Sequence, residues 1–302
     1  MIMDKIKKEK FTIKQFNEKY IDDNACLHQI FLSRYSHLEN CPKCNNKFGY
    51  YKVTDRKCYA CAYCGHQLHP LAETIFHKSS TNLKNWFYAI FLFSTSKNRV
   101  SAKELERQLG VTYKCAYRIA KQIKKLFDEN ISILTNIVEI DETYIGGKES
   151  NKHKDKRTPD NQGRSLKTKS AILGSAQREG NIVAKVVTNT QSSIIKPFIR
   201  ENICITAQVK TDEYAVYNSV AKMGYDHATV DHATVDHGRG EYVNGDAHTN
   251  NLEGFWSQLK RSINVTYHFV SPKYLQTYVN EFAYRYNRRN DTTLLFKSLR
   301  LV

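Results

Sequence analysis

Residues 41–64 read CPKCNNKFGYYKVTDRKCYACAYC, and this stretch decides the fold of the N-terminal part of the chain. It contains two C-x2-C pairs, Cys41 with Cys44 and Cys61 with Cys64, with sixteen residues between them. Two such pairs bring four thiolates to one tetrahedral zinc ion, and this spacing is typical of zinc ribbons. The sequence therefore predicts one structural Zn²⁺ held by Cys41, Cys44, Cys61 and Cys64.

The second pair has an alternative, because Cys58 and Cys61 also form a C-x2-C pair. We favour Cys61 and Cys64, since Gly65 follows and a small residue there eases the turn. Cys58 is then a spare thiol or an exchange ligand. Eight cysteines in a chain that begins without a signal peptide favour metal binding over disulfide bonds.

The composition favours a partner that carries many negative charges. Over 302 residues, 46 Lys and Arg stand against 30 Asp and Glu, a net charge of +16. Nucleic acid is the first candidate; the lysine-rich composition of an AT-rich genome is the alternative. The longest apolar run, residues 86–93, is too short to cross a bilayer. We therefore expect a cytoplasmic, nucleoid-associated protein without a membrane partner.

Residues 101–127 read SAKELERQLGVTYKCAYRIAKQIKKLF and predict two helices joined by a turn. Leu105 and Leu109 lie four apart, Gly110 supplies the turn, and Thr112 can cap the second helix. In a helix-turn-helix the second helix enters the major groove of DNA. An ordinary helical hairpin with a solvated face is the alternative. The residues predicted to face DNA are Lys114, Tyr117, Arg118 and Lys121.

After residue 130 the pattern changes to strands, and two of them end in acids. The predicted elements are a strand in 133–147, a loop over 148–169, two strands around a turn at 178–181, a helix over 192–202 and a strand in 203–217. Asp141 and Asp212 then lie at or near strand ends, where metals and substrates gather in α/β sheets. Aspartates that only form turns or caps are the alternative.

A third carboxylate lies on a predicted amphipathic helix in residues 248–263, HTNNLEGFWSQLKRSI, which Asn250 or Asn251 can cap. Glu253 and Lys260 lie seven apart and so on one side, beside the apolar stripe. Three carboxylates on two strands and a helix suit two Mg²⁺ ions that act on a phosphodiester, and a nearby lysine can hold a phosphate. A surface ion pair of Glu253 and Lys260 is the alternative.

Taken together, these features resemble the DDE transposases of bacterial insertion sequences. The nearest group is the one numbered fifteen-ninety-five, whose catalytic domain is named ISXO2-like. The resemblance spans about residues 25–290. The matching words are CAYCGHQ, AETIFH, LKNWFYAI, QLGVTYKCAYRI, EIDETYIGG, VKTDEYAVY, GEYV, HTNNLEGFWSQLKR and EFAYRYNRR.

The resemblance implies an RNase H-like mixed α/β catalytic domain in which Asp141, Asp212 and Glu253 bind two Mg²⁺ or Mn²⁺ ions. Lys260, together with Arg261, would contact DNA beside them. The implied reaction is cleavage at the ends of the element, followed by attack of the freed 3′-hydroxyl on target DNA. The partners would be double-stranded DNA and further copies of the chain, as a homodimer or larger assembly. His248 and Asn250 belong to the matching word HTNNLEGFWSQLKR, and the resemblance suggests that they help to position the site.

These expectations define a multi-domain α/β protein. Residues 1–36 would form a helical segment, 37–70 a zinc ribbon, 71–130 a DNA-binding helix-turn-helix region and 131–302 the catalytic domain. Two other functions stay open. A nuclease on the same fold would cleave without joining, and a DNA-binding regulator would use the N-terminal modules without catalysis.

Residues 225–237, YDHATVDHATVDH, contain the five residues DHATV twice in succession. Residues five apart face different sides of either a strand or a helix, so the three Asp-His pairs do not form a metal ladder. Asp212 and Glu253 are separated by 40 residues, and by 35 without one copy, a spacing familiar among DDE enzymes. We interpret the repeat as an in-frame duplication that lengthens a loop or strand end and leaves the fold intact.

Overall fold

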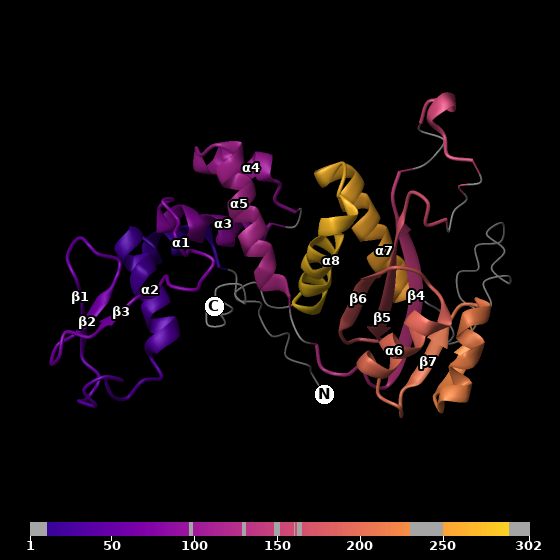
Figure 1. Cartoon of the computed structure of the whole chain (residues 1–302), viewed down its shortest axis with the longest axis horizontal. Coiled ribbons are helices and arrows are strands. Elements are labelled where there is room, and N and C mark those ends of the chain that lie inside the picture. The colour runs from indigo at the N-terminus through magenta and orange to yellow at the C-terminus, as the bar shows by residue number, and fades with distance from the viewer. Residues whose placement is uncertain are drawn as a thin grey trace, which may run out of the picture. The chain divides into compact units, whose positions relative to one another are not determined.

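The computed structural model describes residues 11–96, 99–128, 131–147, 152–159, 161, 165–229 and 250–289. The chain divides into two compact units (Figure 1). The first contains the described residues up to Leu126, together with Arg288 and Arg289, and the second spans Phe127–Asn287. Both units combine helices with a sheet, which confirms the predicted α/β class. Among the described helices, none is both long and apolar enough to span a membrane.

The first unit begins with two helices, followed by a small antiparallel sheet of order β1-β2-β3. The elements are α1 (Ile13–Lys19), α2 (Asp23–Tyr35), β1 (Tyr50–Lys52), β2 (Tyr59–Cys61) and β3 (Gln67–Leu68). The ring of Phe31 on α2 stacks on that of Tyr59 on β2, with 3.9 Å between their centroids. This stacking ties the sheet that carries the cysteines to the helices before it.

Three further helices complete the first unit: α3 (Leu83–Thr95), α4 (Ala102–Leu109) and α5 (Tyr113–Lys124), followed by the 3₁₀ turn η1 (Lys125–Phe127). Gly110 ends α4 in the left-handed conformation, with φ of 62°. The Thr112 hydroxyl accepts a hydrogen bond from the backbone N–H of Cys115 at the start of α5. The predicted helix, turn and cap are therefore confirmed.

The second unit is built on a five-stranded mixed sheet of order β6-β5-β4-β7-β8. Its strands are β4 (Ile137–Ile145), β5 (Ser170–Gln177), β6 (Ile182–Val187), β7 (Gln208–Thr211) and β8 (Asp226–Thr229). Strands β4, β5 and β6 pair antiparallel, whereas β7 and β8 run parallel to β4. The predicted strand after residue 133 and the predicted pair around residues 178–181 are confirmed.

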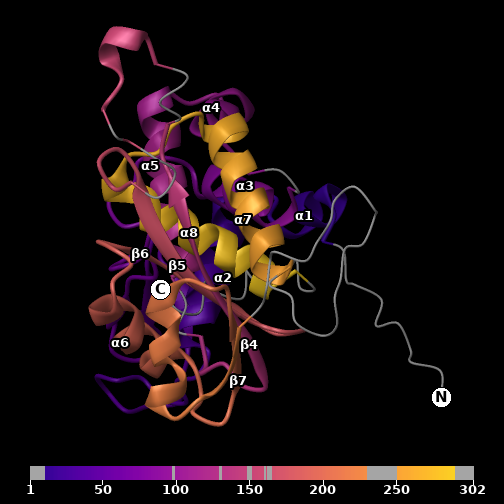
Figure 2. The same cartoon turned by 90° about the vertical axis from the view of Figure 1, so that its right-hand side faces the viewer.

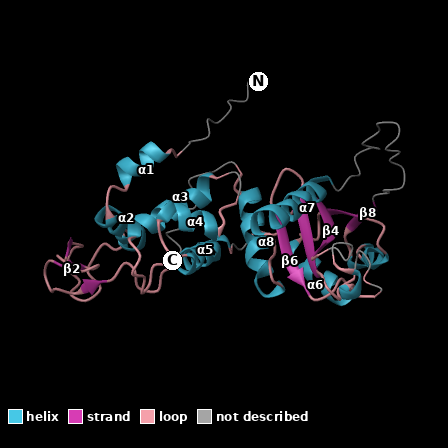
Figure 3. Ribbon diagram, turned by 90° about the horizontal axis from the view of Figure 1, so that it is seen from above, coloured by secondary structure: helices cyan, strands magenta, loops and turns pink. Residues whose placement is uncertain are grey.

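Helices cover both faces of this sheet (Figure 3). On one face lie α6 (Ser192–Asn202) and the 3₁₀ turns η4 (Ala215–Ser219) and η5 (Ala221–Met223). On the other lie α7 (Asn250–Ser262), a π-helix (Ile263–Tyr267) and α8 (Pro272–Asn287). Since side chains alternate along a strand, Glu139 and Asp141 of β4 share the face toward α7, and Glu142 faces the other way.

Helix α7 approaches the sheet closely at Gly174 of β5, which pairs with Asp141 in the β4–β5 ladder. A Cβ atom on Gly174 would lie 2.5 Å from a ring carbon of Trp256 and 3.2 Å from Leu252. The absence of a side chain at Gly174 therefore makes the space in which the Trp256 ring lies beside Asp141.

Residues 148–169 were predicted as a loop. The described residues 152–159 of this segment contain the 3₁₀ turn η3 (Lys154–Lys156) and lie away from the sheet (Figures 1 and 2). Residues Asp226–Thr229 of the first DHATV copy form β8. Asp226 accepts a hydrogen bond from Gln208 Nε2 at 3.1 Å, and His227 Nε2 lies 2.9 Å from the Thr211 hydroxyl. The second copy lies outside the described residues.

Candidate active site and metal centre

The four predicted zinc ligands converge in the first unit. Within the described residues, Cys41, Cys44, Cys61 and Cys64 form the one group of three or more metal-ligating side chains whose ligand atoms all lie within 4.8 Å of one another. The sulfurs of Cys41 and Cys64 are 3.8 Å apart, as are those of Cys44 and Cys61. Four thiolates at these distances suit a tetrahedral zinc ion.

Two left-handed residues shape the turns around this cluster. Gly65 follows the second pair with φ of 69°, and Asn45 occupies the equivalent place after the first pair with φ of 57°. The buried Cys58 lies outside the cluster, with its sulfur 3.8 Å from Gln67 Oε1. The structure therefore brings Cys61 and Cys64 together with the first pair and leaves Cys58 in the core of the small sheet.

The predicted DNA-facing residues of α5 all lie on its exposed side: Lys114, Tyr117, Arg118 and Lys121. The opposite side, with Ala116, Ile119 and Ile123, is buried. Tyr113 is also exposed, and its ring centroid lies 6.2 Å from that of Tyr117. Tyr113 was not among the predicted DNA-facing residues, although its spacing of four residues from Tyr117 places both side chains on one face of the helix.

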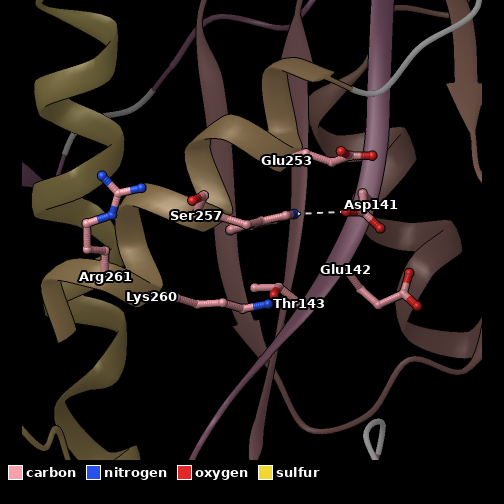
Figure 4. Close-up of a pocket in the computed structure, with 8 residues that line it drawn as sticks. Asp141, Glu142, Thr143, Glu253, Ser257, Lys260 and Arg261 are labelled. Atoms are coloured by element: carbon pink, nitrogen blue, oxygen red, sulfur yellow. Dashed lines mark hydrogen bonds between the residues drawn. The ribbon is translucent and has the colours of Figure 1, made fainter. Parts of the chain in front are cut away.

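In the second unit, Asp141 and Glu253 line one pocket, from β4 and α7 respectively (Figure 4). Trp256, one turn after Glu253, donates a hydrogen bond from Nε1 to Asp141 Oδ2 at 3.1 Å. The other lining residues are Glu142, Thr143, Trp256, Ser257, Lys260 and Arg261. Two of the three predicted carboxylates thus face a common space between strand and helix.

Lys260 lines this pocket, and a second lysine lies near Lys260. In Figure 4 the Lys260 amino group points toward Thr143, whereas the Arg261 guanidinium points away from Asp141. Partial burial lowers the pKa of Lys260, the charge of Asp141 opposes this shift, and the charge of Lys169 adds to it. Lys169, just before β5, is therefore a second cation near the pocket, which the sequence pattern did not indicate.

Asp212 lies next to this pocket, directly after the last residue of β7. The register that pairs Ile137 with Gln208 would, if continued, set Asp212 opposite Asp141. Asp212 Oδ1 accepts a hydrogen bond from the backbone N–H of Tyr214 at 3.0 Å, so Asp212 also forms a turn. Asp212 is not among the residues that line the pocket.

The three carboxylates are more widely spaced than the thiolates. They do not form a group with all ligand oxygens within 4.8 Å in the described part of the chain. Two ions about 4 Å apart would each need only some of the three carboxylates. Carboxylate oxygens are the hard donors that Mg²⁺ prefers, so the chemistry of this donor set fits two Mg²⁺ ions.

Burial raises the pKa of Asp141 to about 7, and the negative charges of Glu142 and Asp212 add to this effect. Hydrogen bonds from the backbone N–H of Glu142 and from Trp256 oppose it. A carboxyl group whose pKa is raised by other acids is stabilised in its charged form by a bound cation. This shift is typical of functional sites.

The structure reveals two buried glutamates on β4, Glu139 and Glu142, that were not among the predicted site residues. Glu142 accepts a hydrogen bond from the Tyr217 hydroxyl at 2.9 Å, on the α6 side of the sheet. Glu139 contacts the first turn of α7, where Asn250 or Asn251 was expected to cap the helix. Asn251 lies inside α7 rather than before it, and the side chain of Asn250 and all of His248 lie outside the described residues.

Two protein families match the chain over these regions. Residues 133–287 match the ISXO2-like transposase domain, and residues 21–67 match the transposase zinc-ribbon domain. The first match includes both strands and the helix that carry the predicted acids. The second includes all four cysteines of the cluster.

Two relatives are similar to this chain. An uncharacterized protein in the transposable element ISH50 of Halobacterium salinarum is 27% identical over 281 residues, covering 88% of this chain and 91% of the relative. An uncharacterized transposase-like protein of Haemophilus influenzae is 26% identical over 102 residues, covering 34% and 77%. One relative is archaeal, so the resemblance does not restrict the source to bacteria. The chain belongs to the family of transposases that combine an ISXO2-like transposase domain with an N-terminal zinc ribbon.

Proposed function

We propose that this protein binds the terminal inverted repeats of an insertion sequence and catalyses Mg²⁺-dependent strand cleavage and strand transfer. The observation that supports this most is the convergence of Asp141, Glu253 and Lys260 at one pocket, with Asp212 after the neighbouring strand. We assign the second unit to the RNase H-like fold, because its mixed sheet carries the acids on β4, on the end of β7 and on α7.

In this proposal Asp141, Asp212 and Glu253 would hold two Mg²⁺ or Mn²⁺ ions. When bound, such ions activate a water or a 3′-hydroxyl and stabilise the leaving oxygen of a phosphodiester. Trp256 orients Asp141 through its indole N–H. Lys260 and Lys169 supply positive charge for a DNA phosphate at the pocket.

The first unit supplies DNA recognition in the same proposal. Zn²⁺ on the four cysteines braces the small sheet, and α5 enters the major groove with its exposed basic and aromatic side chains. We propose 1–36, 37–70, 71–130 and 131–302 as the helical, ribbon, helix-turn-helix and catalytic regions. Because two ends of an element must be joined to one target, the protein would act as a homodimer or larger assembly on double-stranded DNA.

The test uses labelled DNA that carries the terminal repeats of the element encoding this chain, incubated with Mg²⁺ or Mn²⁺. Cleavage followed by joining to a second duplex supports the proposal. Cleavage alone indicates a nuclease, and binding alone indicates a regulator. Asp141→Asn should abolish cleavage and preserve binding, whereas the exposed Asp226→Asn should preserve both. Cleavage that survives Asp141→Asn would show that the acids are assigned wrongly.

A further inference from the structure

Glu139 is a buried carboxylate on β4 that contacts the helix carrying Glu253. Its side chain is fully buried. Its Oε2 accepts hydrogen bonds from the backbone N–H groups of Asn251 at 3.2 Å and Leu252 at 3.4 Å. Its Oε1 accepts from Asn251 Nδ2 at 3.1 Å and from Arg178 Nε at 3.2 Å. Both oxygens of Glu139 are thus engaged by donors from two other parts of the chain.

Glu139 acts as an N-terminal cap of α7, although it is distant from the helix in the sequence. The first N–H groups of a helix have no partner within it, and a negative charge near them is favourable. A cap residue next to the helix would satisfy these groups without fixing the helix to anything else. Glu139 precedes Asn251 by 112 residues and belongs to the central strand. Its hydrogen bonds therefore fix the start of α7 to the sheet.

The same strand carries Asp141. Glu139 and Asp141 are alternate residues on one face of β4, about 7 Å apart along the strand. Glu253 lies in the first turn of α7, directly after the residues that Glu139 holds. One turn later Trp256 donates to Asp141. Helix α7 thus meets β4 at two points, and Glu253 lies between them along the helix.

We propose that Glu139 is a positioning residue that sets the place of Glu253 relative to Asp141 by holding the first turn of α7 on β4. The inference rests on the proposed function for the role of Glu253, and on the hydrogen bonds of Glu139 for the anchor itself. Arg178 balances the charge of Glu139 at the end of β5. Neutralising Glu139 would therefore weaken both the contact with α7 and the ion pair behind it.

The test compares Glu139→Gln with a matched control, Glu281→Gln. Glu281 on α8 is also fully buried, and it accepts from the Tyr267 hydroxyl at 3.0 Å and from Arg285 Nε at 3.3 Å. Both substitutions remove one buried negative charge that pairs with an arginine. A merely structural role of Glu139 would make the two variants behave alike.

Three readouts are taken on the full chain: hydrogen exchange of peptides from α7, Mn²⁺ affinity by paramagnetic titration, and cleavage of terminal-repeat DNA. In Glu139→Gln we expect faster exchange in the first turn of α7. Mn²⁺ affinity and the cleavage rate should each fall roughly 10- to 100-fold, as for other residues that orient metal ligands, with DNA binding unchanged. Glu281→Gln should leave all three readouts, and DNA binding, near wild type.

Unchanged exchange and Mn²⁺ affinity in Glu139→Gln would overturn the inference. If this variant does not fold, Asn251→Ala replaces it, because it removes one donor to Glu139 and keeps the helix. Faster exchange with weaker Mn²⁺ binding in Asn251→Ala then supports the anchor, and wild-type values overturn it. If the wild-type chain does not cleave DNA, the proposed function fails, while hydrogen exchange still decides whether Glu139 holds α7.

Discussion

Substitution of Gly174 by alanine tests the close approach of α7 to the sheet. The new Cβ atom would lie 2.5 and 2.7 Å from two ring carbons of Trp256 and 3.2 Å from Leu252 Cδ2. Carbon atoms in contact lie about 3.5 to 4.0 Å apart, so the indole ring would have to move by roughly 1 Å. Trp256 is only 4% exposed and belongs to the core between α7 and the sheet. The neighbours therefore leave it little room.

Overpacking of this kind costs about 1 to 3 kcal/mol. For a unit of this size, each kcal/mol lowers the melting temperature by roughly 2 to 4 °C, so we expect Gly174→Ala to unfold roughly 2 to 12 °C below wild type. The Trp256–Asp141 hydrogen bond, now 3.1 Å long, would lengthen as the ring moves. Cleavage should therefore fall by more than the loss of folded protein accounts for.

Tryptophan fluorescence provides the assay. The chain has two tryptophans, and Trp86 belongs to the first unit. In a Trp86→Phe background, thermal unfolding monitored by tryptophan fluorescence reports on Trp256 alone. The matched control is Gly254→Ala on α7, where an added Cβ meets no atom within 4 Å. Because alanine is the better helix former, this control should be more stable by up to about 1 kcal/mol. A Gly174→Ala variant that melts at or above the background would refute the close approach.

Three further predictions concern the metals, the repeat and pH. Cys58→Ser should retain one zinc per chain by elemental analysis, whereas Cys44→Ser should lose it; zinc loss in Cys58→Ser would contradict the cluster. Deletion of residues 226–230 leaves one DHATV copy and should preserve the melting temperature and keep or improve cleavage; failure to fold would contradict a neutral duplication. Because burial and then the charge of Glu142 raise the pKa of Asp141 from 3.8 to about 7, its contribution to the stability of metal-free protein is complete below pH 4 and is lost as pH rises through 7. Thermal unfolding from pH 4 to 8 should show a smaller decline in Asp141→Asn, and equal declines would count against the shift.

The features predicted well from the sequence are those set by residues close together in the chain. The two C-x2-C pairs, the turn at Gly110 and the cap at Thr112 each depend on a few neighbouring residues, and the structure has them where the pattern indicates. Strand and helix periodicity also indicated which side of α5 and α7 is buried. Local rules of capping, turn formation and alternation are sufficient for features of this kind.

Contacts between distant segments were not predictable in this way. Glu139 reads as one more residue of an apolar strand, and only the packing of α7 on β4 makes it a cap. Gly174 reads as a glycine in a strand, and only the close approach of Trp256 and Leu252 on α7 explains why a larger residue would not fit. The place of Asp212 depends on the register of two parallel strands separated by β5, β6 and α6 in the chain. Periodicity predicts that a side chain faces the core, but it does not predict which residues that side chain contacts.

The DHATV duplication lies between two parts of the chain, Tyr225 and helix α7, that hydrogen bonds tie to the rest of the second unit. Before it, Tyr225 is 7% exposed, and its hydroxyl donates to the Ile203 carbonyl at 3.2 Å. The second copy is preceded by Val230, so pairing it with β7 in place of the first would remove this tyrosine from the core. The register of β8 is therefore fixed by the residue before the repeat, which a deletion of one copy does not change.

After the repeat, the start of α7 is held on β4 by hydrogen bonds to Glu139 and, one turn later, by the Trp256–Asp141 bond. Neither contact depends on how many residues connect β8 to α7. A change of five residues in that connection alters the entropy of closing it by only a few tenths of a kcal/mol, since this cost grows with the logarithm of length. The anchor on Glu139 thus gives a physical reason why Glu253 can keep its place beside Asp141 when the spacing from Asp212 changes, and it predicts that weakening the anchor removes that tolerance.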